Sequence, residues 1–176
     1  MKVLIAYATT EGHTRKIAET VTDQVSSLGH SAKLHDAMRK RETVHAGDHD
    51  AFIVAGSVHQ ERHQREIEAF VASCLKELSE KPSMFISVSL AAAFPEKAAD
   101  AAKYISRFQS ETGWKPDVSL TVAGAVKSEE YDYFQQQILE HVVLKDDLTH
   151  RAGQNQDFTN WQALSRVIES FITDVN

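Results

Sequence analysis

The sequence predicts an α/β fold in which a five-stranded parallel sheet is covered by helices on both faces. Short apolar runs, typical of strands buried on both sides, alternate with longer segments whose apolar residues recur at helical spacing. The length of 176 residues suits one domain with its own core. We therefore expect residues 1–176 to form a single, doubly wound domain whose strands are joined by right-handed crossovers.

The predicted strands are short, apolar and bounded by turn-forming residues. Val-Leu-Ile-Ala-Tyr at residues 3–7 is the first, Gly56 closes the third, and Pro82 precedes the fourth. Five such strands are typical of a doubly wound sheet with the order 2-1-3-4-5. The predicted strands are residues 3–7, 31–35, 51–55, 84–88 and 118–123.

Three of the four predicted helices carry an apolar stripe, as Ile17, Val21 and Val25 show for the first, and the helix 98–108 follows Pro95 and Glu96. Residues 128–157 interrupt the alternation as a long insertion between the fifth strand and the last helix, with an amphipathic stretch followed by a loop. A compact fold does not need so long a connection, and such insertions are often functional. The predicted helices are residues 17–28, 67–78, 98–108 and 159–175.

Composition and charge exclude several functions. The net charge of −6 disfavours nonspecific nucleic-acid binding and leaves no polybasic patch for anionic lipids. No apolar run approaches the roughly 20 residues that span a bilayer, and the strand-like run after Met1 is no signal peptide. A single cysteine suits a reducing compartment. We expect a cytoplasmic protein, and peripheral contact with the inner face of the cell membrane stays open.

The loop after the first strand has the residues of a phosphate cradle. Thr9, Thr10 and Thr14 offer hydroxyls, and Gly12 lets the backbone approach an anion. The helix that follows presents free N–H groups and the positive end of its dipole. Arg15 and Lys16 are mildly unfavourable in a first helical turn, and a bound dianion would reverse that sign. Helix capping with two solvated cations is the alternative.

Other nucleotide folds can be tested against the same loop. The sequence has no Gly-x-Gly-x-x-Gly after the first strand and no Gly-x4-Gly-Lys-[Ser/Thr] P-loop. The acidic pair of a phospho-acceptor domain is also missing after the first strand, where Tyr7, Ala8 and Thr9 stand. FMN is the ligand that fits what remains.

Residues 9–14, Thr-Thr-Glu-Gly-His-Thr, resemble the flavodoxin signature for FMN phosphate. Further motifs resemble, in order, the bacterial menaquinone-dependent protoporphyrinogen IX dehydrogenases, and the likeness covers nearly the whole chain. The insertion matches that family in position and differs in charge, since acidic residues predominate in it. These motifs are VAGSVH at 54–59, SVSL at 87–90 with PEK at 95–97, GWKPD at 113–117 and VAGA at 122–125.

The resemblance implies a flavodoxin-like fold, FMN as cofactor, a porphyrinogen substrate and a quinone acceptor. It places the ends of the third and fourth strands beside the flavin ring. No catalytic acid or base is implied, because the flavin itself accepts the hydrogens. The implied cofactor-binding residues are Thr9, Thr10, Glu11, Gly12, His13, Thr14, Ser57, Val58, His59, Ser87, Val88, Ser89, Leu90 and Ala91.

Three further residues are candidates for substrate binding. His63, close to two arginines, suits an anionic substrate, or else belongs to a polar loop and helix start. Tyr131 and Tyr133 begin the insertion near the ligand end of the sheet, where aromatic rings cover a flavin, receive a flat substrate or pin the insertion to the domain.

The remaining notable residues predict structure. His45 and His49 lie with two aspartates in a surface loop away from the ligand end of the sheet, so we predict no metal site. Cys74 falls on an apolar stripe and is predicted to be a buried small hydrophobe. Trp161 is expected in the core and Trp114 as a packing anchor.

Two other functions stay open on the sequence. An acidic flavodoxin could shuttle electrons between protein partners, with the insertion as a docking element. A flavodoxin-like fold that has lost its cofactor would instead be colourless and take up no FMN.

Overall fold

Five parallel strands form the middle layer of the molecule, in the order β2-β1-β3-β5-β6. The computed structural model describes residues 1–39, 44–126 and 156–175. The order confirms the predicted 2-1-3-4-5 once the short strand β4 (Arg62–His63), which pairs antiparallel with the end of β3, is set aside. The five strands are β1 (Lys2–Ala8), β2 (Ser31–Asp36), β3 (Ala51–His59), β5 (Ser83–Ser89) and β6 (Val118–Ala123).

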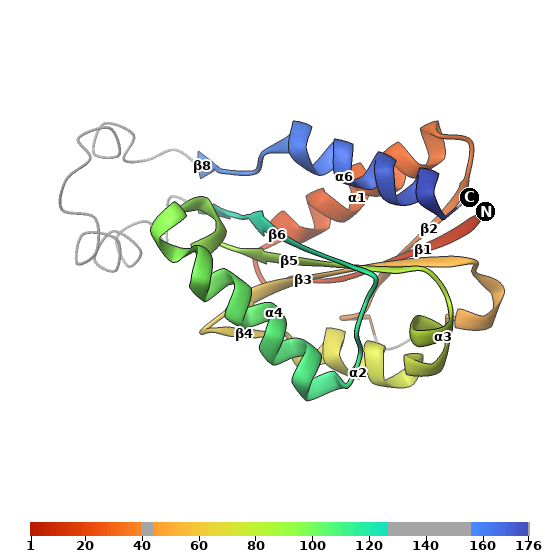
Figure 1. Cartoon of the computed structure of the whole chain (residues 1–176), viewed down its shortest axis with the longest axis horizontal. Helices are drawn as coiled ribbons and strands as arrows, with labels where there is room; N and C mark the ends of the chain where they lie inside the picture. Colours follow the sequence, from red (N-terminus) through yellow and green to blue (C-terminus); the bar gives the residue numbers. More distant parts are fainter. Residues whose placement is uncertain (40–43, 127–155, 176) are drawn as a thin grey trace.

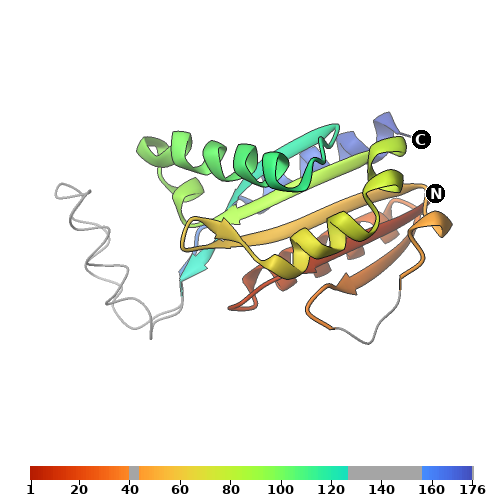
Figure 2. The ribbon, with the colours of Figure 1, turned by 90° about the horizontal axis from the view of Figure 1, so that it is seen from below.

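Helices cover both faces of the sheet (Figures 1 and 2). Helices α1 (His13–Ser27) and α6 (Trp161–Asp174) lie on one face, and α2 (Arg65–Ser73), α3 (Leu75–Glu80) and α4 (Ala98–Thr112) lie on the other. The short elements are the 3-10 helices Ala46–Asp48, Ala91–Ala93 and Pro95–Lys97 and the antiparallel pair β7 (Ala125–Val126) and β8 (Gln156–Asp157).

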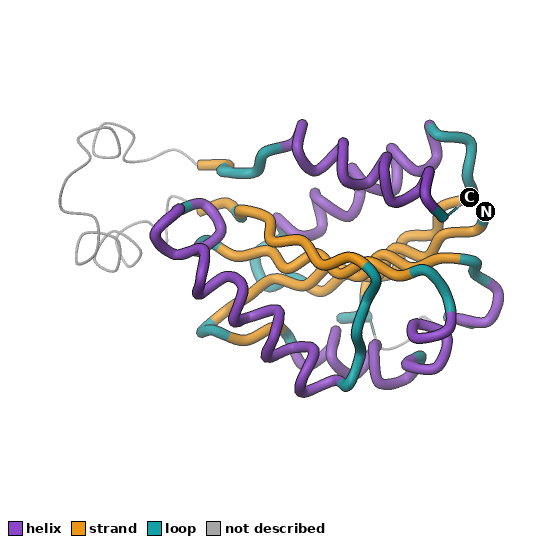
Figure 3. The backbone as a smooth tube through the Cα atoms, viewed as in Figure 1, coloured by secondary structure: helices purple, strands orange, loops and turns teal. Residues whose placement is uncertain are grey.

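Two apolar cores lie on either side of the sheet, because successive side chains of a strand point to opposite faces. Val3 and Ile5 of β1 pack with the α1 and α6 side chains, whereas Leu4 and Ala6 pack with those of α2, α3 and α4. The central strands β1, β3 and β5 are therefore buried at nearly every position, which explains their apolar runs. Figure 3 shows the strands as a layer between the helices.

Two predicted boundaries are wrong for identifiable reasons. Strand β3 does not end at Gly56 but continues to His59, because it turns back into the hairpin with β4. A Cβ on Gly56 would lie 3.1 Å from the ring of His63, so the glycine makes room for that ring. The predicted helix 67–78 is two helices, broken where Cys74 leaves helical geometry at φ −131°.

The β3–β4 hairpin turns through two residues with positive φ, Gln60 at 49° and Glu61 at 64°. A two-residue turn of this kind matches the twist of the strands and favours glycine or asparagine, because a Cβ is crowded in the left-handed region. The hairpin therefore carries local backbone strain next to His59, its last β3 residue.

Replacing Glu61 by glycine is expected to raise the free energy of unfolding by about 1 kcal/mol, because the crowding of the Cβ in the left-handed region is removed and outweighs the entropy that glycine loses on folding. Urea denaturation measures this directly. Glu66→Gly, in helix α2, is the matched control and is expected to lower stability by about the same amount. A loss of stability in Glu61→Gly would show that the turn is not strained.

Candidate functional site

A pocket lies at the carboxyl ends of the parallel strands, where ligands bind in doubly wound sheets. Its walls come from the carboxyl ends of β3 and β5 and from the segments that follow β1, β5 and β6, so four parts of the chain distant in sequence meet there. The lining residues are Thr9, Thr10, Glu11, His13, Thr14, Ser57, Val58, His59, Val88, Ser89, Leu90, Gly124 and Ala125.

The loop before α1, residues 9–14 and named the phosphate loop, has the geometry of an anion cradle. Gly12 is the N-cap of the helix and has φ 95°, a conformation that side chains other than hydrogen disfavour. Its N–H donates to Thr9 Oγ1 at 3.0 Å, which fixes the loop. Gly12 itself has no side chain with which to cap the helix, and the first turn carries no acidic residue. The N–H groups of that turn are therefore available to an anion.

The buried hydroxyl of Thr14 is a second, independent indication that this loop binds a ligand. Its side chain is 1% exposed, and within the described residues its Oγ1 has no hydrogen-bond partner. Leaving a buried hydroxyl unpaired costs about 1–3 kcal/mol. A phosphate oxygen at the helix N-terminus would supply the missing acceptor, so these residues fit the phosphate of FMN.

The two cations after the loop have carboxylate partners in this structure. Arg15 Nε lies 2.7 Å from Glu19 Oε1, and Lys16 Nζ lies 2.9 Å from Asp157 Oδ2. Sequence reasoning considered only a bound dianion or solvent as their partners. Glu19 could have been found from its i,i+4 spacing to Arg15.

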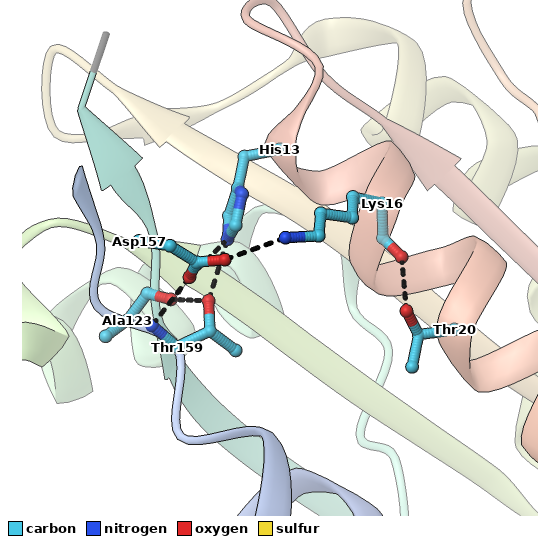
Figure 4. A network of polar contacts seen from close by, with 6 residues as sticks. All are labelled: His13, Lys16, Thr20, Ala123, Asp157 and Thr159. Atoms are coloured by element: carbon cyan, nitrogen blue, oxygen red, sulfur yellow. Dashed lines mark hydrogen bonds and ion pairs between the residues drawn. The ribbon is translucent and has the colours of Figure 1, made fainter. Parts of the chain in front are cut away.

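Asp157 fastens strand β8 to the phosphate loop (Figure 4). Its carboxylate is 3.5 Å from His13 Nε2 and accepts a hydrogen bond from the Thr159 N–H. Thr159 Oγ1 lies 2.7 Å from the same His13 nitrogen and donates to the Ala123 carbonyl. The contacts of Asp157 and Thr159 thus hold the pair β7–β8 against the start of α1 and the end of β6.

Burial and neighbouring charge shift the pKa values of this network. Burial lowers the pKa of His13, although Asp157 opposes that shift. The pKa of Asp157 is lowered as well, because hydrogen bonds from Lys16 and Thr159 outweigh the effect of its burial. The network is therefore a neutral imidazole beside an ionised carboxylate at neutral pH.

The structure separates the residues predicted beside the flavin ring into two groups. Those at the ends of β3 and β5 that line the pocket, such as Val58 and Val88, face it, whereas Ser87 and Ala91 are not among its lining residues. Ser87 is fully buried on the α4 side of the sheet, because its place in β5 alternates with that of Val88. Its hydroxyl forms a 3.0 Å hydrogen bond with His63.

His63 lies below the pocket rather than in it. Its ring is 6% exposed and packs with Phe85 and Phe108 at centroid distances of 5.1 and 4.9 Å. Burial lowers its pKa to about 4. The structure therefore places this substrate-binding candidate in the core, under β5, while Tyr131, Tyr133 and the rest of 127–155 lie outside the described residues.

Gln64, which sequence reasoning missed, joins two sides of the pocket. Its side-chain amide donates to Ser57 Oγ, at the end of β3, and to Thr10 Oγ1, in the phosphate loop, the latter at 3.3 Å. No local sequence signal marks it, because its partners come together only when β4 folds back on β3.

Cys74 and the two tryptophans are buried or partly buried and make packing contacts. Cys74 is buried, as predicted, and burial raises its pKa to about 11. Trp114 is fully buried and donates to the Leu78 carbonyl, whereas Trp161 is only partly buried beneath Lys16. Within the parts of the chain that the structure describes, no three histidine, cysteine or acidic side chains are grouped to hold a metal.

The described helices include none that is long and apolar enough to cross a membrane.

Comparison with known proteins identifies the protein family that this chain matches. Residues 4–151 match the flavodoxin domain family. The protoporphyrinogen IX dehydrogenase [quinone] of Escherichia coli K12 is 25% identical over 166 residues, which cover 94% of this chain and 91% of that protein. The Leishmania major protein of the same name is 23% identical over 97% of this chain and 74% of its own length.

Solved structures agree on the fold. Oxidised flavodoxin 1 from Bacillus cereus superposes with a TM-score of 0.53 at 16% identity, over 81% of this chain and 99% of that one. The fold and pocket define a flavodoxin-like FMN protein. This chain belongs to the flavodoxin domain family, and FMN is its cofactor.

Proposed function

We propose that this chain is an FMN-dependent dehydrogenase that oxidises protoporphyrinogen IX and passes the electrons to a quinone. The observation that carries the proposal is the likeness to the E. coli enzyme, which covers 94% of this chain. Coverage of that extent includes part of the segment between β7 and β8, the feature that lengthens this fold. The similarity is therefore not confined to the elements that hold FMN.

The proposal gives each part of the pocket one task. Loop residues 9–14 hold the phosphate, and the residues that line the pocket at the ends of β3 and β5, Ser57 to His59 and Val88 to Leu90, border the flavin ring. When bound, FMN accepts the hydrogens of the substrate, and the protein orients both molecules and excludes competing reactions.

The apolar residues that line the pocket suit a flat, largely apolar substrate. Val58, Val88 and Leu90 contribute apolar side chains, and Ala125 belongs to the strand pair at the base of the insertion. Across the mouth, His59 Nδ1 lies 3.9 Å from Glu11 Oε1, and the His59 side chain is 54% exposed. The exposed imidazole of His59 would offer an acidic substrate an N–H donor at this edge of the pocket.

Turnover tests the proposal. Under anaerobic conditions, the FMN-loaded protein is expected to convert protoporphyrinogen to fluorescent protoporphyrin continuously when menaquinone is present, and only to the extent of its own flavin when menaquinone is omitted. A rate no faster than that of free FMN with menaquinone would contradict the proposal.

The same preparation distinguishes an electron shuttle. A flavodoxin acting between protein partners would accumulate the one-electron reduced flavin during titration with a chemical reductant and would produce no protoporphyrin. We expect direct two-electron reduction of the flavin and formation of protoporphyrin.

A further inference from the structure

Gln64 occupies a position that its own helix does not explain. It is the N-cap of α2, yet its side chain accepts no hydrogen bond from that helix. Its amide instead bridges Ser57 and Thr10, which both line the pocket. Its Oε1 is buried and, within the described residues, has no hydrogen-bond partner. The fold alone therefore gains little from this orientation of the amide.

The bridge determines which way two hydroxyls can donate. A hydroxyl has one O–H to donate and lone pairs that accept. Ser57 Oγ and Thr10 Oγ1 both accept from the Gln64 Nε2 group. Each O–H is then free to donate elsewhere, and the pocket is the place where an acceptor would stand.

An anion needs donors, so the direction of this bridge matters for phosphate. If a carboxylate stood at position 64, both hydroxyls would donate to it and present lone pairs to the pocket. The same substitution would add a negative charge one hydrogen bond away from the phosphate loop. The two effects act in the same direction, against a bound dianion.

We propose that Gln64 is a positioning residue for the cofactor, which holds the Thr10 and Ser57 hydroxyls as donors toward FMN and so contributes to selection of its phosphate. The inference rests on FMN as the cofactor and is independent of the substrate. If the protein failed to oxidise protoporphyrinogen, the proposed role of Gln64 in FMN binding would be unaffected.

Flavin titration of the FMN-free protein, followed by quenching of flavin fluorescence, tests this role. Riboflavin, which lacks only the phosphate, is the internal reference. Gln64→Glu is expected to raise the Kd for FMN about 30-fold or more and that for riboflavin less than about threefold. Gln64→Met, which keeps the length and adds no charge, is expected to raise the FMN Kd about fivefold and leave riboflavin nearly unchanged.

Gln60→Glu is the matched control, because it adds the same charge to the exposed turn of the same hairpin without touching the two hydroxyls. Its FMN Kd is expected to stay within about twofold of the wild type. Equal weakening of FMN and riboflavin in the Gln64 variants, or an unchanged FMN Kd, would overturn the proposal. Gln64→Met decides the question if Gln64→Glu does not fold.

Discussion

Acidification from pH 7 to pH 4 is expected to lower the free energy of unfolding by about 3 kcal/mol through His63 alone. Burial lowers the pKa of this imidazole from 6.5 to about 4, with Glu111 weakly opposing. The unfolded chain therefore binds a proton at a higher pH than the folded chain does. The contribution is fully present above pH 6.5 and is lost progressively as the pH falls to about 4.

His63→Gln isolates this contribution, because glutamine can still pair with the buried Ser87 hydroxyl but does not titrate in this range. Urea denaturation at a series of pH values gives the stability curves of both proteins. The variant is expected to be less stable at pH 7 and to show a flatter curve between pH 6.5 and 4. Parallel curves would show that His63 is not held neutral by burial.

Thr14→Val is expected to have opposite effects on stability and on cofactor binding. Valine has the shape of threonine without the hydroxyl that is buried and unpaired in the structure. The FMN-free variant is expected to be more stable than wild type by about 1 kcal/mol. Its FMN Kd is expected to rise at least about tenfold, because a hydrogen bond to a charged phosphate is lost.

Thr22→Val is the matched control on the same helix. The Thr22 hydroxyl already donates to the Ala18 carbonyl at 2.7 Å and lies away from the pocket. This control is expected to leave the FMN Kd unchanged. A Thr14→Val protein that is destabilised and still binds FMN normally would assign Thr14 to the fold rather than to the cofactor.

Local patterns in the sequence were sufficient for the sheet and for the place of the loop 9–14 in the pocket at its carboxyl end. Buried strands such as β1 and the first half of β3 are continuous apolar runs, and the loop 9–14 is contiguous, so both are visible in a short window. The break at Cys74 was not visible, because the apolar stripe continues on both sides of it.

The contacts that complete the site depend on long-range folding. Asp157 reaches Lys16 across most of the chain, and Gln64 reaches Thr10 only because of the β3–β4 hairpin. His63 is polar in type and lies next to arginines in sequence, yet the hairpin turns it into an aromatic cluster. Sequence spacing alone carries no information about such pairs.

Anaerobic mixing of the FMN-loaded protein with protoporphyrinogen, followed by visible absorption, tests the proposed function most directly. We expect the absorption bands of oxidised FMN to bleach as protoporphyrin forms, and to return when menaquinone is added. Bound FMN that stays fully oxidised in the presence of excess protoporphyrinogen would contradict the proposed function.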